Sequence, residues 1–274
     1  GAAVAGRLRG RRSVGLTGAR VIPAGVMDAL RVAAPPTDAS ALTTELRMVK
    51  SPAELALLAE AARISDLGMR AGLAAVADGA REIEMAAAAE HAIRSAGAEL
   101  SFTTVAGAGP RTALGTFLPG DRRMRRGEAV LLDCGARVHG YHGDMCRTVA
   151  VGEPRPELEQ ALEAVAAAVE AAVAAARPGV TVAELRESAR RAVEDAGLGE
   201  AWWGEFMPHG AGTGQHEPPY GDRDPGCELR EGMVLCIEPG VLLPGVAGVV
   251  HEQMIAVAAR GADVLNELPL RMWS

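Results

Sequence analysis

The sequence is poor in basic charge and has no long hydrophobic run, and each shortage excludes a class of protein. It carries 28 lysines and arginines against 35 aspartates and glutamates, a net charge of -7, so we expect no surface that tracks phosphates and no nucleic-acid partner. No stretch reaches the roughly 18 uninterrupted apolar residues of a membrane span, and the alanine-rich segments carry regularly placed glutamate and arginine. We therefore predict no membrane partner.

Cysteine is also scarce and forms no CxxC pair. Three of the four cysteines lie in apolar, strand-like segments where a small buried thiol fits. The four are Cys134, Cys146, Cys227 and Cys236. The first residues lack the charged and then apolar profile of a secretion signal. We interpret the cysteines as reduced and the protein as cytoplasmic. The chain begins at Gly1 without a methionine, from which we expect a trimmed or truncated start.

With 49% hydrophobic residues in 274, the chain can bury a sizeable core in one large domain with a small appendage. Residues 13–33 predict a short strand, a turn and a helix, and "APPTDAS" after them has the composition of a linker. This part is too small to fold alone. We therefore divide the chain into an appended segment, 1–43, and a main domain, 44–274.

The main domain predicts helices and strands in an order that occurs twice. Ser51, Pro52 and Glu54 form a capping box that starts a helix ending near Ala77, and Thr181 with Glu184 starts another. The other predicted helices span 83–96 and 157–176, the helix after Thr181 spans 182–196, and predicted strands span 101–109, 129–133 and 144–151. The order is helix, helix, strands in each half.

The two halves also match residue by residue, which indicates an internal repeat. Five positions correspond at a constant offset of one hundred: Gly79, Glu84, Met85, Ala96 and Gly97 with Gly179, Glu184, Leu185, Ala196 and Gly197. Farther on, "RGEAVLLD" matches "EGMVLCIE", so that in both copies a glycine is followed six residues later by a carboxylate.

Four carboxylates stand at the ends of apolar strands, where burial is costly unless a cation is bound. They are Asp133, Asp144, Glu238 and Glu252. Two halves that each deliver a pair of acids would form a cluster for a pair of divalent cations, and His209 would add a nitrogen ligand, a set suited to Mn, Co, Zn or Fe. Taken alone, a hairpin with a turn aspartate and surface histidines in a Gly- and Pro-rich loop remain the alternatives.

These residues resemble the M24 metallopeptidases, a family that includes methionine aminopeptidase, aminopeptidase P, prolidase and creatinase. The resemblance runs from about Thr44 to the C-terminus. It rests on "ELRMVKSPAEL", the eleven-residue step from Asp133 to Asp144, "GYHGDMCRT", the seven-residue step from His209 to His216, "IEPG" and "VVHEQMIAV". It implies the α+β pita-bread fold, with two pseudo-symmetric halves around a curved antiparallel sheet. Residues 1–43 would be the remnant of a creatinase-type N-terminal domain.

The resemblance also implies roles. Asp133 would bind one metal ion, Asp144 and Glu252 would bridge two, and His209 with Glu238 would complete the other. Such pairs lie about 3.5 to 4 Å apart and hold a water or hydroxide as the nucleophile. Glu238 would also shuttle protons, and the second catalytic residue, His216, would hydrogen-bond the carbonyl or the developing oxyanion. Mn is the first choice among the metals.

The chain departs from the family on the substrate side. A histidine that active relatives carry before the first aspartate is replaced by Gly115 or Thr116, and Glu205 replaces a further one. Val250 stands where relatives often have arginine. Our candidates for the substrate pocket are Thr116, Trp203, Glu205 and Phe206, although core packing is the commoner fate of such aromatic residues. We interpret His139 and His142 as the tip of an exposed hairpin.

The resemblance therefore predicts an Xaa-Pro aminopeptidase or dipeptidase that acts on small peptides and forms a homodimer. The first alternative is a creatinase-like C–N hydrolase of a small amide, which the missing histidine favours. Methionine aminopeptidase ranks lower because it normally retains that histidine. A non-catalytic binding module ranks lowest because such relatives tend to lose the ligands.

Overall fold

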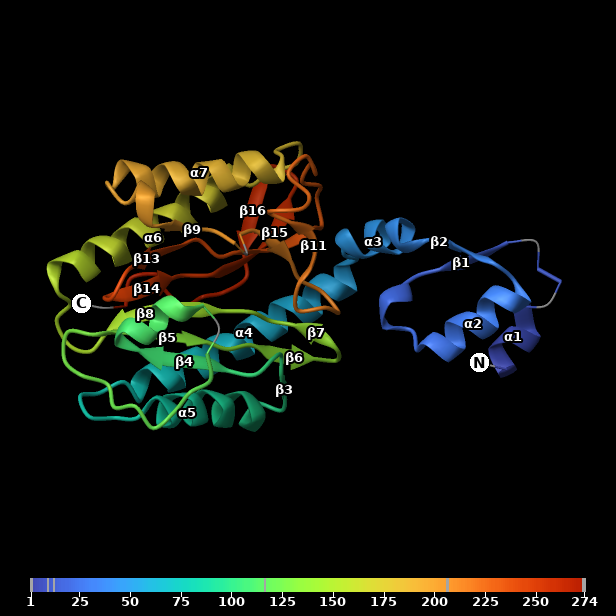
Figure 1. Ribbon diagram of the computed structural model, residues 1–274. Helices are drawn as coiled ribbons and strands as arrows, with labels where there is room; N and C mark the ends of the chain where they lie inside the picture. Colours follow the sequence, from blue (N-terminus) through green and yellow to red (C-terminus); the bar gives the residue numbers. More distant parts are fainter. Residues whose placement is uncertain (1, 9, 12, 116, 206, 273–274) are drawn as a thin grey trace. The chain divides into compact units, whose positions relative to one another are not determined.

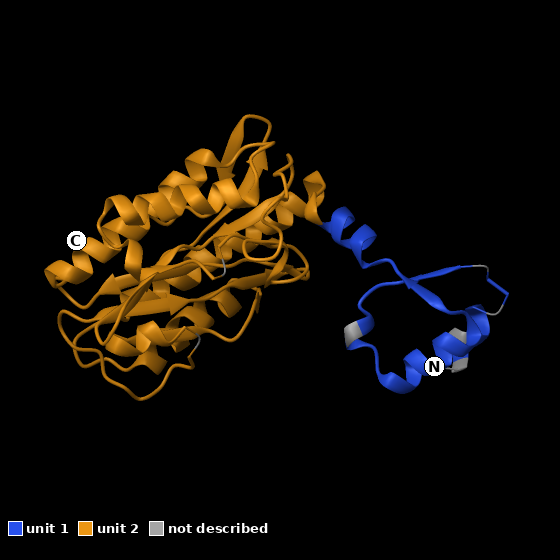
Figure 2. Ribbon diagram, turned by 45° about the horizontal axis from the view of Figure 1, so that its top comes forward, with its two compact units in different colours: residues 1–47 blue, residues 48–274 orange. Residues whose placement is uncertain are grey.

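The computed structural model describes residues 2–8, 10–11, 13–115, 117–205 and 207–272. The chain divides into two compact units, residues 1–47 and 48–274 (Figure 2). The division expected from the sequence lies four residues earlier, after residue 43. Among the described residues, none of the helices is long and apolar enough to cross a membrane.

The first unit contains one parallel strand pair connected through a helix. Its elements are α1 (Ala2–Leu8), β1 (Val14–Leu16), η1 (Ala19–Val21), α2 (Ala24–Ala33), β2 (Pro36–Asp38) and α3 (Ser40–Met48), the last of which runs one residue into the second unit. The predicted strand, turn and helix are present, but the predicted linker is wrong in part because Pro36–Asp38 pairs with Val14–Leu16. Pro36 is tolerated as the first residue of a strand.

The second unit has two pairs of long helices. They are α4 (Pro52–Ala74), α5 (Glu82–Ser95), α6 (Pro156–Ala175) and α7 (Val182–Asp195), with short η2 (Gly109–Leu114) and η3 (Gly199–Ala201). The predicted signals start one helix of each pair, α4 and α7. The capping boxes of Ser51 with Glu54 and of Thr181 with Glu184 are both formed. Helix α4 ends at Ala74, before the predicted Ala77, because the amides of Ala75 and Val76 bond three residues back and tighten the last turn.

The strands of the second unit are short, and every pair that the described residues form there is antiparallel. The first half holds β3 (Glu99–Leu100), β4 (Val105–Ala108), β5 (Ala129–Asp133), β6 (Ala136–Val138), β7 (Tyr141–His142) and β8 (Cys146–Ala150). The second half holds β9 (Trp202–Trp203), β10 (His209–Gly210), β11 (Glu217–Tyr220), β12 (Val234–Ile237), β13 (Gly240–Leu243), β14 (Ala247–Val250), β15 (Gln253–Ala258) and β16 (Gly261–Val264). They form small sheets ordered β4-β5-β8, β3-β6-β7, β14-β13-β9 and β11-β10-β12-β15-β16.

These sheets lie between the two helix pairs, and each pair covers its own half (Figure 1). Helices α4 and α5 bury residues such as Met69 and Met85 against Val130 and Leu132 of β5. Helices α6 and α7 bury residues such as Val165 against the second half, where Leu235 is an equally buried member of the same core. Helix α4 comes so close to β5 that a Cβ on Gly72 would lie 2.4 Å from a methyl carbon of Leu132.

The internal repeat is visible in the backbone. The amide of Gly127 donates to Val151, and the amide of Gly232 donates to Val257, so equivalent turns precede β5 and β12. Both glycines have positive φ, which only glycine adopts without strain. Because equivalent turns precede β5 and β12, Asp133 and Glu238 reach equivalent positions at the ends of the two strands.

Candidate metal centre

Strand register in the second half brings three of the predicted ligands to one face. His209 of β10 pairs with Cys236 of β12, and Cys236 pairs with Met254 of β15. Glu238 directly follows β12, and Glu252 directly precedes β15. Because side chains alternate along a strand, Glu238 shares the face of Cys236.

The first half contributes two aspartates next to this face. Asp133 ends β5 and pairs with Cys146 of β8, and Asp144 lies two residues before Cys146. The amide of Glu252 donates to the carbonyl of Cys146 at 2.9 Å. This bond joins the two halves where their acidic residues meet.

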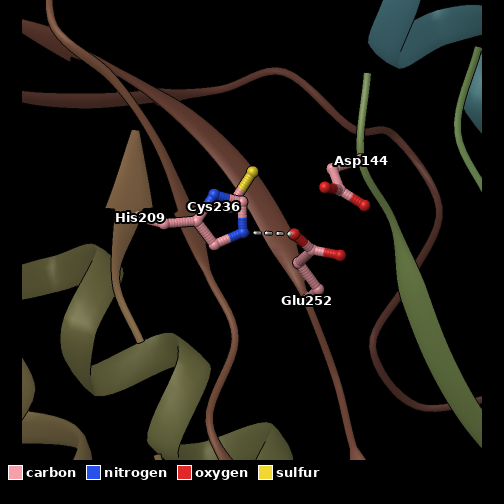
Figure 3. Close-up of side chains that lie close together, drawn as sticks. All are labelled: Asp144, His209, Cys236 and Glu252. Atoms are coloured by element: carbon pink, nitrogen blue, oxygen red, sulfur yellow. Dashed lines mark ion pairs between the residues drawn. The ribbon is translucent and has the colours of Figure 1, made fainter. Parts of the chain in front are cut away.

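The cluster is compact. Nε2 of His209 lies 3.7 Å from Oε1 of Glu252 and 4.0 Å from Oε2 of Glu238. Asp144, His209, Glu252 and Cys236 each offer one ligand atom, and these atoms lie within 4.8 Å of one another. Glu252 lies between the imidazole of His209 and the carboxylate of Asp144 (Figure 3).

Unsatisfied polar atoms show that this cluster fits a cation. Among the described residues, Oδ1 of Asp133, Nε2 of His209 and Oε1 of Glu252 are buried without a hydrogen-bond partner. Buried polar atoms are normally paired, because an unpaired one forfeits its hydration. Carboxylate oxygens and a neutral imidazole nitrogen are also the donors that Mn, Co, Zn and Fe accept. The residues therefore fit one or more divalent ions.

The electrostatics of the cluster agree with this fit. Burial raises the pKa of Asp144 to about 7, and burial together with repulsion from Asp144 raises the pKa of Glu238 to about 8. Burial followed by the neighbouring carboxylates also raises the pKa values of Asp133 and Glu252 well above their ordinary values. Burial lowers the pKa of His209 to about 3, so its ring is neutral and able to bind a metal. The four acids repel one another, and a cation would relieve this repulsion.

His216 stacks on His209, with ring centroids 4.0 Å apart, and burial lowers its pKa. Its neighbour Gln215 donates to Oδ2 of Asp144 at 3.4 Å. Glu217 pairs with Lys50 at 2.9 Å and also accepts from the amide of Gly214. The loop that carries His216 is thus held at both sides, by an acid of the cluster and by a buried ion pair.

A cavity of about 330 Å³ adjoins the acids. It is lined by Asp133, Asp144 and Glu238, by Gln215 and His216, and by Phe102, Thr103, Val105, Thr112, Gly115, Leu131, Cys146, Trp203, Leu242 and Val250. Its volume is at the lower end of the range for ligand pockets, which suits a small substrate.

The pocket candidates from the sequence are placed as follows. Trp203 lines the cavity. Glu205 instead lines a smaller one of about 90 Å³ beside His209 and His216. Thr116 and Phe206 lie outside the described residues. Gly115, the other position for the missing histidine, does line the larger cavity.

Two residues of the site have no role predicted from the sequence, and the prediction for a third residue is wrong. The first two are Gln215 and Cys236, although the position of Cys236 two residues before Glu238 on a strand is a usable signal. His139 lies at an exposed turn as expected, but the exposed position predicted for His142 is wrong. His142 is buried, and its Nδ1 lies 2.8 Å from Oγ of Ser101.

Residues 56–259 match Metallopeptidase family M24. The chain belongs to this family. The chain is 34% identical over 224 residues to an Xaa-Pro dipeptidase of Pyrococcus horikoshii, covering 81% of this chain and 64% of that protein. It is 34% identical over 226 residues to the putative dipeptidase YkvY of Bacillus subtilis, covering 82% of this chain and 62% of that protein. The chain thus spans a little under two thirds of the length of these relatives.

Solved structures confirm the fold. The prolidase from Pyrococcus furiosus superimposes with a TM-score of 0.90 at 30% identity, covering 97% of this chain and 79% of that one. An X-Pro aminopeptidase from Thermotoga maritima superimposes with a TM-score of 0.88 at 28% identity, covering 95% of this chain and 74% of that one. The predicted α+β pita-bread fold of this M24 chain is therefore correct.

Proposed function

We propose that this M24 protein is a metal-dependent peptidase that releases an N-terminal residue from Xaa-Pro peptides, as an aminopeptidase or dipeptidase. The observation that carries the proposal is the buried acidic cluster that opens onto a cavity sized for a small substrate. The names of the relatives, Xaa-Pro dipeptidase and prolidase, support the choice of proline peptides.

The ligands that we propose are Asp133, Asp144, His209, Glu238 and Glu252, which would hold two divalent ions, with Mn as the first choice and Co, Zn or Fe as alternatives. The three unpaired buried atoms of this set support the assignment. When bound, such ions polarise a carbonyl and lower the pKa of water, which provides a nucleophile at neutral pH.

The chain's own groups then complete the reaction. Glu238 lines the cavity, so its carboxylate can accept a proton from the attacking water and pass it to the leaving nitrogen. His216 also lines the cavity, and as a neutral ring it can donate a hydrogen bond to the carbonyl oxygen of the scissile bond. Gln215 holds Asp144 in place through its amide.

Hydrolysis of a small amide is the second candidate. Glu205 adds a carboxylate beside His216 in the smaller cavity, where it could bind the cationic group of an amidine or of an amide substrate.

The proposal also includes the setting and the assembly of the protein. The four free cysteines support a reducing, cytoplasmic setting. We also propose that the protein forms a homodimer.

Mass spectrometry of products from Mn-loaded protein and a panel of Xaa-Pro peptides and small amides tests the function. We expect release of the N-terminal residue from Xaa-Pro peptides. Glu238→Ala protein should lose this activity because it lacks both a ligand and the proton carrier. Equal cleavage by the variant would contradict the role of Glu238, and cleavage of the small amides alone would replace the first candidate with the second.

A further inference from the structure

The charge lining of the 330 Å³ cavity restricts which peptides it can accept. Three of its lining residues are carboxylic acids, and most of the remaining wall is apolar, including Leu131, Val250 and Trp203. Among the described residues that line it, none is a lysine or arginine. Along the sequence, the residue after Gly115 is a threonine and the third residue after Trp203 is a phenylalanine, and neither residue type carries a charge.

The arginines closest to the cavity along the chain are bonded to other partners. Arg111, next to Thr112, pairs with Glu82 at 3.1 Å and donates to the carbonyl of Leu118. Arg147, next to Cys146, is fully buried, and its guanidinium donates to the carbonyls of Cys146, Leu268 and Pro269.

Two further cations contact residues that follow His216 in the chain. Arg223 lines the smaller cavity, where it is 3.4 Å from Asp222 and packs over the ring of Tyr220. Lys50 is buried against Glu217. Neither lines the larger cavity.

Bound metal ions would not supply the missing charge. Two divalent ions carry four positive charges, and the four carboxylates of the cluster match them. His209 would bind a metal as a neutral ring and so would add no charge to the centre. The centre with its metals therefore has no surplus positive charge for a further anion.

A free Xaa-Pro dipeptide brings such an anion. Its terminal carboxylate is attached to the proline Cα, which is bonded to the scissile nitrogen, so the carboxylate must enter the cavity when the bond reaches the acidic cluster. Removing a carboxylate from water without a cationic partner is costly. In a longer peptide or a peptide amide, the same position holds a neutral carbonyl.

We propose that this site selects peptides in which the proline carboxyl is blocked, by a further residue or an amide, over free Xaa-Pro dipeptides. The proposal rests on the proposed peptidase function and gives it a substrate class. On this proposal the protein acts mainly as an aminopeptidase and less as a dipeptidase, although relatives bear the name dipeptidase.

The test compares three substrates with one N-terminal residue: Ala-Pro, Ala-Pro-amide and Ala-Pro-Ala, each with the Mn-loaded protein at neutral pH. We expect kcat/KM for the amide and the tripeptide to exceed that for the dipeptide by about tenfold to a hundredfold, the range for a lost hydrogen bond to a charged group. A dipeptide cleaved equally well or better would overturn the preference and leave the peptidase function intact. Cleavage of none of the three would contradict the peptidase function itself.

Two charge variants test the cause of the preference. Leu242 is partly exposed and Thr103 is exposed at the cavity wall, so each can be changed with little effect on the core. Leu242→Lys and Thr103→Lys place a cation at different points of the wall, and Leu242→Met and Thr103→Gln are neutral controls of similar length. We expect at least one lysine variant to raise the dipeptide-to-amide ratio of kcat/KM about fivefold or more relative to its control. An unchanged ratio in both would refute charge as the cause.

Discussion

At the residue scale, burial and mutual repulsion raise the pKa values of the acids in the cluster. The pH dependence of the protein's stability therefore tests this repulsion directly. In the folded protein the pKa of Asp144 is about 7 and that of Glu238 about 8, because both are buried and Asp144 also repels Glu238. In the unfolded chain both groups titrate near their ordinary values of 3.8 and 4.5. Between the unfolded and the folded pKa values, the folded state therefore binds more protons than the unfolded state. The free energy of unfolding falls as pH rises through the folded pKa values.

We predict that the free energy of unfolding of metal-free protein decreases from pH 6.5 to about 8. His209 acts in the other direction, because its folded pKa of about 3 is below the ordinary 6.5, but this weakens the protein only below pH 6.5. Urea unfolding with a chelator over this pH range measures the effect. Glu238→Gln should flatten the slope. A stability that is constant or rises with pH would show that the acids do not repel one another as described.

At the residue scale, the sequence is informative where spacing carries chemistry. The family resemblance predicts Asp133, Asp144, His209, Glu238 and Glu252 as ligands, and the fold brings the acids of both halves together. Cys236 could be predicted only from its position two residues before Glu238 on a strand, because a thiol in an apolar strand otherwise has the same sequence pattern whether it faces the core or a site. The burial of His142 is equally hidden, because it depends on Ser101, a residue far away in the chain.

At the scale of elements, the loop that carries His216 depends on a buried ion pair. Nζ of Lys50 lies 2.9 Å from Oε1 of Glu217, and the two side chains are only 2% and 5% exposed. Lys50 directly precedes the N-cap of α4, so the pair ties this helix to the loop of the site.

Lys50→Met should destabilise the protein by about 3 to 5 kcal/mol, because it leaves the Glu217 carboxylate buried without its partner. The double variant Lys50→Met with Glu217→Met should recover most of this loss, since neither charge is then buried alone. Urea unfolding of both variants provides the comparison. A double variant as unstable as the single one would indicate that the lysine stem and not the ion pair stabilises the loop.

Local signals predict the helices, and long-range pairing explains most of the errors. Capping boxes place the starts of α4 and α7 because the side chains involved are three residues apart. Strand β2 has the composition of a linker. It forms a strand because it pairs with β1, which is separated from it in the sequence by a helix. The predicted pita-bread fold is correct, but its strands form several small sheets, and the pairing of β10 with β11 contains a register shift between His209 and Gly210. No local sequence pattern specifies that shift.

At the scale of the whole chain, the internal repeat explains how the acidic cluster arises between two halves. Equivalent glycine turns start β5 and β12, and an acid of the cluster stands at the end of each strand. The repeat and the family motifs are visible in the sequence. The cavity is not, because its lining residues come from many separate segments and their charges combine only in the folded protein.

The metal content of the purified protein tests the central claim most directly. After loading with Mn and removal of free metal, mass spectrometry of the elements should find about two ions per chain. Glu252→Gln, which removes a buried carboxylate that we propose as a ligand, should bind fewer ions. Glu231→Gln, an exposed control on the same half, should match the wild type. Folded wild-type protein that retains no Mn, Co, Zn or Fe, or a Glu252→Gln variant that binds as many ions as the wild type, would contradict the account.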